Sequence, residues 1–390
     1  MSYPVDDVKL ERVRALMAEE NLDALVVRAP DNVVYLTNYW PMKGYAMAVF
    51  PREGPTTLVV LEPQEDEALA MAWNAEVRPF RFYHPEDPRP PLNRALDMTI
   101  EVLRERGLTG RVAIELSQGG QSTDRMMGEP TVYTYEYFTT LMDAVSEPVD
   151  AVPLLTRARL SKTVQEIERI RMANEVATLA LEAVKPRIRA GMKTAELGAM
   201  WEGYVHQLGI GYEGTVKMAR GFSLVWSGPG IRTFTPTKDE VVVENEPTLF
   251  EIWVCVDGYW NDLTKNMVVG ELTPRYNTLL DDLLTIFDRA IDYARPGATL
   301  GGLDELIRAE IDAAGYLQPS HPVAHGVGAR AHEPPWPHRA ASGLIEEGMV
   351  LAIEPGTYFP EGGGLRLEDN FLITADGNEK LNRYEDDFRK

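Results

Sequence analysis

The chain has 390 residues, of which 44% are hydrophobic, and a formal net charge of −21 from 60 acidic and 39 basic side chains. This length suits two domains, and the hydrophobic share is enough for a sizeable core. The acidity argues against nucleic acid and anionic membranes as partners, because both attract clustered positive charge.

The sequence also favours a reducing compartment. Cys255 is the one cysteine, so no intramolecular disulfide can form. The N-terminal residues lack the basic start and apolar run of a signal peptide, and no apolar stretch approaches about 18 residues. We therefore expect a cytoplasmic protein without a transmembrane helix.

Residues 1–155 are predicted to form a small α/β domain. An amphipathic helix opens it, and apolar runs follow at 24–27, 33–36, 46–50 and 56–61. The last two runs flank a Pro-Arg-Glu-Gly-Pro turn and predict a β-hairpin. A helix ending near Gly107 precedes a further strand candidate at 111–115. The one histidine of this part, His84, lies in a proline-rich loop, so no catalytic cluster is expected here.

Residues 156–390 begin with a clear helix start. Thr163-Val164-Gln165-Glu166 is a capping box, and apolar side chains then recur at spacings of three and four as far as Ile188. Gly191 suits the C-cap of this helix. Further helices are expected from Thr194, over 275–294 and over 300–314, with β-rich segments between and after them. The pattern predicts an α+β domain in which helices surround antiparallel strands.

A pair of carboxylates lies in the segment 251–266. Asp257-Gly258 favours a two-residue hairpin loop, which would place Trp253 opposite Asp262 and Glu251 on the same face. Two carboxylates at the centre of one sheet face are costly without a positive partner. The segment therefore predicts a cation site, with an exposed hairpin carrying two surface acids as the alternative.

Later segments add side chains of the kinds that bind metals. In His325-Gly326-Val327-Gly328 the glycines allow the backbone to approach closely beside a histidine, and His332 follows seven residues later. Glu354 ends an apolar run where a turn begins, and Glu368 shares strand parity with Arg366. Two other histidines are predicted to be loop residues without an assignable role: His321 and His338.

In their order, these segments resemble the creatinase, prolidase and methionine aminopeptidase superfamily. The matching motifs are Gly-Tyr-x-x-Asp-x-Thr (258–264), His-Gly-x-Gly-x-x-x-His-Glu-x-Pro (325–335), Gly-Met-Val-x-x-x-Glu-Pro-Gly (348–356) and Arg-x-Glu-Asp (366–369). Residues 31–38 resemble the smaller domain of the prolidase and creatinase branch. The resemblance implies a pita-bread catalytic domain, a curved antiparallel sheet with helices outside, behind a smaller α/β domain.

The resemblance further implies a site for two divalent ions. The expected ligands are Glu251, Asp262, His325, Glu354 and Glu368, with Asp262 and Glu368 shared between the ions. This hard set of oxygens and one imidazole favours manganese, with cobalt, zinc and iron as alternatives. Two such ions lower the pKa of a shared water, which can then attack a carbonyl carbon.

Roles for neighbouring residues follow from the same resemblance. Glu354 would relay a proton, and His332 would hydrogen-bond the substrate carbonyl or the developing oxyanion. Thr264 would orient Asp262, and Arg366, also expected to serve catalysis, would hold Glu368. The residues expected around the ligands or in the substrate pocket are Tyr259, Thr264, Trp253 and Arg232.

Three departures from the family pattern concern the site itself. Glu251 stands where the family has an aspartate. Trp253 stands where a glycine is usual, so it would narrow the pocket or stack on the substrate. After the Ser227-Gly228-Pro229 turn the prolidase-like members carry a histidine, but here Arg232 is the nearest polar replacement, and it suits a carboxylate.

The function implied is metal-dependent hydrolysis of a C–N bond in a peptide or small amide, similar to Xaa-Pro dipeptidases and aminopeptidases but with a modified pocket. A homodimer is expected, as is common among relatives with this N-terminal domain. One alternative is a metal-independent, creatinase-like amidinohydrolase or a lyase, whose activity would survive chelation. The other is a non-catalytic binding protein, which would turn over no member of a dipeptide panel.

Overall fold

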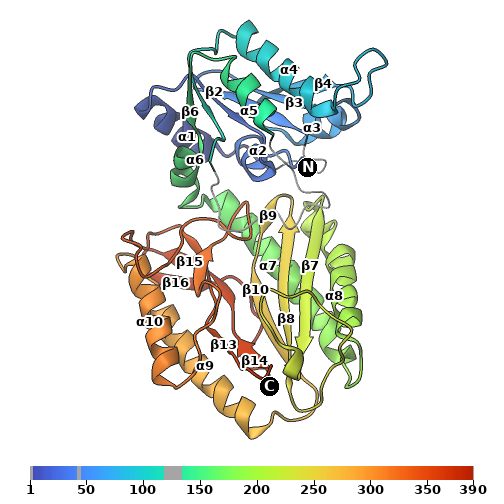
Figure 1. The fold of residues 1–390 in the computed structure, drawn as a ribbon, viewed down its shortest axis with the longest axis vertical. Coiled ribbons are helices and arrows are strands. Elements are labelled where there is room, and N and C mark those ends of the chain that lie inside the picture. The colour runs from blue at the N-terminus through green and yellow to red at the C-terminus, as the bar shows by residue number, and fades with distance from the viewer. Residues whose placement is uncertain (1–2, 42–44, 118–133, 390) are drawn as a thin grey trace. The chain divides into compact units, whose positions relative to one another are not determined.

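The computed structural model describes residues 3–41, 45–117 and 134–389 of the chain (Figure 1). It divides into two compact units between Arg159 and Leu160, rather than between residues 155 and 156 as expected. The reason is that Leu154, Leu155 and Ala158 are buried in the N-terminal core. Within the described residues no helix is long and apolar enough to span a membrane.

The N-terminal unit is built on a six-stranded sheet of order β4-β3-β2-β1-β5-β6. The pairs β1–β2 and β2–β3 are antiparallel, and the other three are parallel. The strands are β1 (Ala24–Val27), β2 (Met47–Pro51), β3 (Thr56–Leu61), β4 (Ala75–Phe80), β5 (Arg111–Ile114) and β6 (Glu147–Asp150). The helices are α1 (Asp7–Glu19), α2 (Pro30–Thr37), η1 (Glu62–Gln64), α3 (Glu65–Met71), α4 (Pro91–Glu105), α5 (Tyr135–Met142) and α6 (Val152–Arg159).

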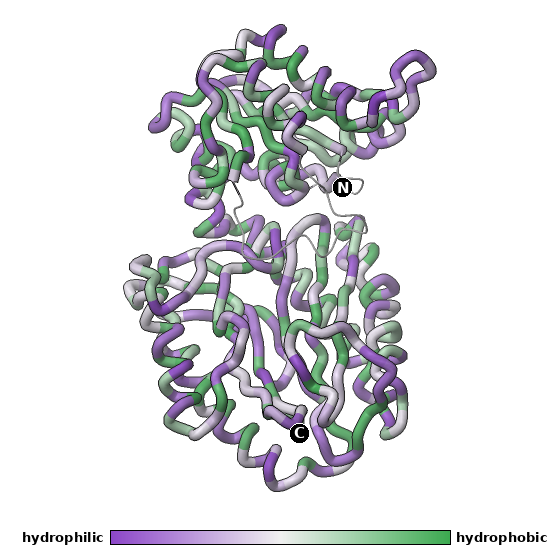
Figure 2. The backbone as a smooth tube through the Cα atoms, in the orientation of Figure 1, coloured by the Kyte–Doolittle hydropathy of each residue, from purple (hydrophilic) through white to green (hydrophobic). Residues whose placement is uncertain are grey.

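Both faces of this sheet are buried, which explains its nearly continuous apolar strands (Figure 2). Side chains alternate along a strand, so Leu25 and Val27 enter one core while Ala24 and Val26 enter the other. The predicted β2–β3 hairpin is confirmed. The apolar run at 33–36 belongs to the short helix α2.

The C-terminal unit contains two antiparallel sheets and a small hairpin. The first sheet has the order β10-β8-β7, and β9 also pairs with β8: β7 (Ala219–Ser227), β8 (Pro247–Val256), β9 (Tyr259–Trp260) and β10 (Leu263–Val268). The second has the order β11-β12-β15-β16: β11 (Ala324–Gly326), β12 (Val350–Ile353), β15 (Asp369–Thr374) and β16 (Gly377–Lys380). The hairpin is β13 (Gly356–Tyr358) with β14 (Gly364–Arg366). An isolated bridge between Thr264 and Glu368 joins the two sheets.

Helices lie outside both sheets, as predicted for this domain (Figure 1). They are α7 (Val164–Val184), η2 (Lys185–Arg187), α8 (Thr194–Gly209), η3 (Tyr212–Gly214), η4 (Gly228–Gly230), α9 (Pro274–Tyr293) and α10 (Leu300–Ala313). The capping box at Thr163 and Glu166 is confirmed. The predicted helix end near Gly191 is wrong, because Pro186 lacks the N–H that an α-helix needs and the chain leaves α7 after Val184.

Candidate metal centre

The first sheet has one apolar face and one face that carries the site, and the side chains of its central strand β8 point alternately to each. Phe250, Ile252 and Val254 belong to the core that includes α7 and α8. Because successive side chains of a strand point to opposite faces, Glu251 and Trp253 face the other way, towards the second sheet's ligands. The helices thus cover one side of the sheet and leave the other for polar chemistry.

The β8–β10 hairpin has the predicted register. It closes over the two-residue loop 257–258, and Glu251 pairs with Thr264. The same register places Trp253 opposite Asp262, with Glu251 diagonal to Asp262 on one face. The pattern of turn residues and alternating side chains was therefore sufficient to align the two acids.

The loop after β11 returns His332 to His325. The backbone N–H of Glu333 donates to the carbonyl of Gly326 at 2.9 Å. A Cβ atom on Gly326 would lie 2.3 Å from the carbonyl oxygen of Pro334, so glycine is required for this close approach. The two imidazole rings consequently lie with their centroids 4.5 Å apart.

The five expected ligands and His332 come together in three overlapping groups. In each group one ligand atom per residue lies within 4.8 Å of the others. The groups are Glu251 with Asp262 and Glu368; His325 with Glu354 and Glu368; and Asp262 with His325 and His332. Asp262, His325 and Glu368 each belong to two groups, and the two carboxylates among them are the residues expected to be shared between ions.

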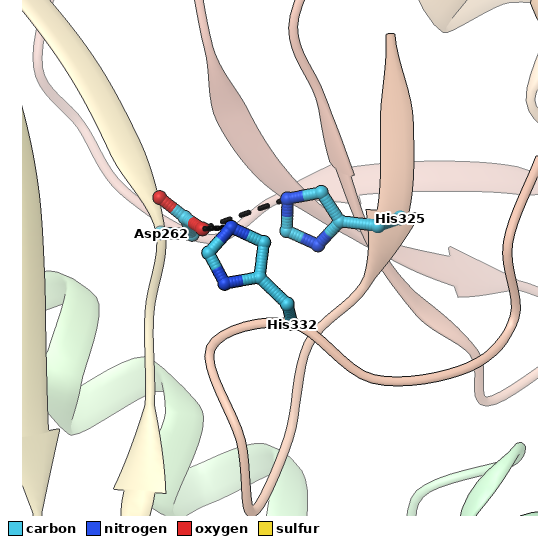
Figure 3. A group of neighbouring side chains, drawn as sticks. All are labelled: Asp262, His325 and His332. Carbon is cyan, nitrogen blue, oxygen red and sulfur yellow. Dashed lines mark ion pairs between the residues drawn. The ribbon is translucent and has the colours of Figure 1, made fainter. Parts of the chain in front are cut away.

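His325 lies at the centre of these contacts. Its Nε2 is 3.5 Å from Asp262 Oδ2, 3.6 Å from Glu354 Oε1 and 3.9 Å from Glu368 Oε1. Figure 3 shows both imidazoles approaching the same carboxylate, with His332 Nε2 at 3.2 Å from Asp262 Oδ2. The His332 side chain is 30% exposed, so a substrate can reach it.

The donor set fits divalent cations. Asp262, His325, Glu354 and Glu368 are all buried. Within the described chain, His325 Nε2 makes no hydrogen bond, and no backbone amide or hydroxyl donates to the Asp262 carboxylate. Buried carboxylates without such partners are costly unless a cation compensates them.

The pKa shifts have the same physical origin. Burial raises the pKa of Asp262 well above its usual value, and the charges of Glu368 and Glu354 raise it further. Burial, followed by the charge of Glu368, likewise raises the pKa of Glu354. Burial lowers the pKa of His325, which keeps the imidazole neutral and able to coordinate. The Trp253 side chain lowers the pKa of Asp262, but by less than burial and the two charges raise it.

The contacts of Thr264 differ from those predicted, and Arg366 pairs with Glu251 in addition to the predicted Glu368. The Thr264 hydroxyl lies 2.7 Å from Glu368 Oε2 and 3.1 Å from Glu251 Oε2, so it does not orient Asp262. Two residues along a strand are about 6.6 Å apart, and Thr264 is paired with Glu251 instead. Arg366 contacts Glu251 directly and donates from Nε to Thr264 at 2.7 Å, whereas its Nε is 3.9 Å from Glu368 Oε2.

Sequence reasoning missed Asn370, which holds the backbone of Asp262. The Asp262 N–H donates to Asn370 Oδ1 at 3.1 Å, and Asn370 Nδ2 donates to the Asp262 carbonyl at 2.8 Å. Its position directly after the Arg-x-Glu-Asp motif was the available signal.

The prediction that His321 lacks a role is wrong. His321 is buried, with Nδ1 at 3.2 Å from Glu354 Oε2 and Nε2 at 3.0 Å from the hydroxyl of Tyr358. That hydroxyl also lies 3.1 Å from an Arg366 Nη1 donor. The proline on each side of Ser320-His321 indicates a loop, but the contact with Glu354 is not visible in the local sequence. The spacing of four residues before His325 was the only local signal.

Two residues expected near the ligands have other contacts. The Tyr259 hydroxyl donates to Glu166 Oε1 at 2.9 Å, because Tyr259 pairs with Val256 and shares its face towards the helices. Arg232 is exposed, and its Nη1 donates to the carbonyl of Pro229 at 3.0 Å within its own turn. Neither residue belongs to the three ligand groups.

Comparison with known proteins decides the family. Residues 168–375 match the model of Metallopeptidase family M24, and residues 9–161 match that of the Creatinase/Prolidase N-terminal domain. The chain belongs to metallopeptidase family M24. The predicted resemblance, the two-domain pita-bread fold and a metal-dependent peptidase activity are thereby confirmed.

Two curated relatives align with this chain over nearly the whole length of both proteins. The chain is 27% identical over 381 residues to the Xaa-Pro dipeptidase of Pyrococcus furiosus, covering 97% of this chain and 98% of the relative. It is 25% identical over 394 residues to the Xaa-Pro dipeptidase of Lactobacillus helveticus, covering 98% of each. The solved prolidase structure of Pyrococcus horikoshii OT3 has the same fold, with a TM-score of 0.79 at 24% identity over 98% of this chain and 99% of that one.

Proposed function

We propose that this metallopeptidase cleaves short peptides of the Xaa-Pro type with two divalent ions, manganese being favoured. The ligands are Glu251, Asp262, His325, Glu354 and Glu368. The observation that carries the proposal is the convergence of these five residues in adjoining ligand groups, with the carboxylates of Asp262 and Glu368 each in two of them. Relatives named Xaa-Pro dipeptidase that align over nearly the whole chain support the substrate class.

Bound ions would supply Lewis acidity, lowering the pKa of a water and polarising the scissile carbonyl. The chain supplies the rest. Glu354 would take a proton from the attacking water and return it to the leaving nitrogen. His332 is the accessible imidazole, and it donates a hydrogen bond to the substrate carbonyl oxygen as negative charge develops there.

Arg366 and Thr264 position ligands rather than substrate. Together they contact Glu251, and the Thr264 hydroxyl also contacts Glu368. Such contacts fix the orientation of a carboxylate.

The substrate carboxylate is assigned to the loop after η4. Arg232 is exposed in that loop, where its Nη1 donates to the carbonyl of Pro229 at 3.0 Å. An exposed guanidinium suits the C-terminal carboxylate of a dipeptide.

The direct test uses the full-length protein after exhaustive chelation. Proline release from Gly-Pro, Ala-Pro, Leu-Pro and Phe-Pro is measured before and after addition of Mn²⁺, Co²⁺, Zn²⁺ or Fe²⁺. We expect no release from the chelated protein and release from at least one dipeptide after metal addition. Release that survives chelation and disappears in His325→Ala would support the metal-independent alternative. No release under any condition would support a binding protein.

We further propose a homodimer in the cytoplasm. The buried Cys255, which is free in the structure, is compatible with a reducing compartment. Sedimentation equilibrium tests the assembly, for which a mass near twice the 43.7 kDa of the chain is expected.

A further inference from the structure

Trp253 occupies a central place on the site face of the first sheet. Along β8 it is two residues from Glu251, so both side chains point to the same face. Across the sheet it lies opposite Asp262 on one side and opposite Phe222 of β7 on the other. A large side chain therefore stands between Asp262 and the edge strand β7, next to Glu251 on the same strand.

The indole is closely surrounded. Its ring centroid is 6.4 Å from that of His332, and the Trp253 side chain is 7% exposed. The ring of Phe222 lies 6.0 Å from that of Trp260, which closes the hairpin end of this face. The indole of Trp253 thus takes up space beside His332 and Asp262.

A substrate must use the same volume. In the proposed pose its scissile carbonyl reaches His332, and its neutral amino group lies at the end of the site formed by Glu251 and Asp262. The α-carbon between these two groups is then next to the indole, so the N-terminal side chain points at Trp253. The residue after the scissile bond extends away from this corner.

We propose that Trp253 is a specificity-determining residue that limits the N-terminal residue of the substrate to small side chains such as glycine and alanine. The inference rests on the proposed Xaa-Pro hydrolysis and names the Xaa class. Large side chains would be excluded because they would have to displace the buried indole, and packed protein interiors give way little.

The experiment compares kcat/KM for Ala-Pro and Phe-Pro in the metal-loaded wild type, Trp253→Ala and Trp253→Phe. We expect the wild type to prefer Ala-Pro. In Trp253→Ala the ratio of Phe-Pro to Ala-Pro should rise by at least about 10-fold, the discrimination that pocket size can supply, with Trp253→Phe in between. A wild-type preference for Phe-Pro, or a ratio unchanged in Trp253→Ala, would overturn the proposal.

A matched control is Trp336→Ala. Its ring lies 6.2 Å from that of His325, on the histidine side of the centre. We expect the substrate ratio to change by less than about twofold, because this ring does not adjoin the acidic pair. An equal shift in both variants would show that any loss of a tryptophan relaxes the site, and the proposal would be wrong.

A binding measurement separates this inference from the proposed function. L-Alaninamide and L-phenylalaninamide are titrated into the metal-loaded proteins by calorimetry, which needs no turnover. Tighter binding of alaninamide in the wild type and a gain for phenylalaninamide in Trp253→Ala support the pocket limit even if no dipeptide is cleaved. Equal preference in wild type and variant contradicts it. Tryptophan fluorescence and Mn²⁺ titration verify that each variant is folded and metal-competent.

Discussion

Arg366 contacts the carboxylate of Glu251, whereas Glu354 lies 3.2 Å from the imidazole of His321. The carboxylates at the two ends of the ligand set, Glu251 and Glu354, therefore have neighbours of different charge. Burial lowers the pKa of His321 and so favours a neutral ring at one end, while a guanidinium competes for the carboxylate at the other. We expect the ion at the Glu251 end to bind more weakly than the ion at the Glu354 end.

The first prediction concerns the two ends separately. Glu251→Gln should weaken the weaker class of Mn²⁺ sites by at least about 10-fold and leave the tighter class within a few-fold. Glu354→Gln should weaken the tighter class instead. Isothermal titration of the metal-free protein measures both. A single class of sites that responds equally to both substitutions would contradict the assignment.

The second prediction concerns the hydroxyl of Thr264. Thr264→Val keeps the side-chain shape but removes a group that contacts Glu251, Glu368 and Arg366. We expect metal affinity to fall by about 10- to 100-fold and stability by about 1–3 kcal/mol, because a buried guanidinium N–H loses its acceptor.

Thr248→Val is the control for this substitution. Thr248 lies on β8 and is fully buried, as Thr264 is on β10, and its hydroxyl lies 2.9 Å from that of Ser227. The Thr248→Val variant should lose stability but keep its metal affinity. Equal losses of affinity in both variants would mean that Thr264 acts through general packing.

The third prediction is a pH dependence of metal stabilisation. In the metal-free protein the pKa values of Asp262 and Glu354 are raised, so their contribution to stability is present at low pH and is lost as pH rises through the folded-state pKa. The lowered pKa of His325 has the opposite sign, since its contribution is lost as pH falls.

An ion must displace protons from Asp262 and Glu354, whose pKa values are raised, so the rise in Tm on adding Mn²⁺ should grow steadily between about pH 5 and pH 8. Thermal unfolding with and without metal measures this, and calorimetry in two buffers should detect proton release on binding. A metal-induced rise in Tm that is constant over this range would contradict the shifts. In Asp262→Asn the slope should be smaller.

The fourth prediction concerns His321. His321→Ala removes the ring between Glu354 and the hydroxyl of Tyr358, so we expect kcat to fall by about 10- to 100-fold with a much smaller change in KM. His321→Gln, which can still hydrogen-bond, should recover part of kcat. His338→Ala is the control, because His338 is exposed. A rise in KM with kcat unchanged would instead place His321 in substrate binding.

Local patterns accounted for much of the site. The Asp-Gly loop and strand alternation placed Glu251, Trp253 and Asp262 on one face, and four motifs named the ligands that the structure brings together. Where a local rule was overlooked, the prediction failed: apolar spacing continues to Ile188, but Pro186 ends the helix earlier.

Other features depend on residues that are distant in the chain. The contact of Arg366 with Glu251 joins two sheets, and that of His321 with Glu354 joins a loop to the end of a strand. Neither can be inferred from spacing, because their geometry arises only when the sheets pack. Tyr259 was assigned to the site by its motif, although its parity with Val256 turns it towards the helices.

The bridge between Thr264 and Glu368 is the seam at which the two sheets meet. Glu251 and Asp262 lie on one side of this seam, and His325 and Glu354 lie on the other. An ion bound by residues of both sheets would therefore hold the sheets together as well as take part in catalysis. Depletion of divalent ions should thus lower the stability of the C-terminal unit and abolish catalysis together. The stability of this enzyme would then depend on the metal supply of its surroundings.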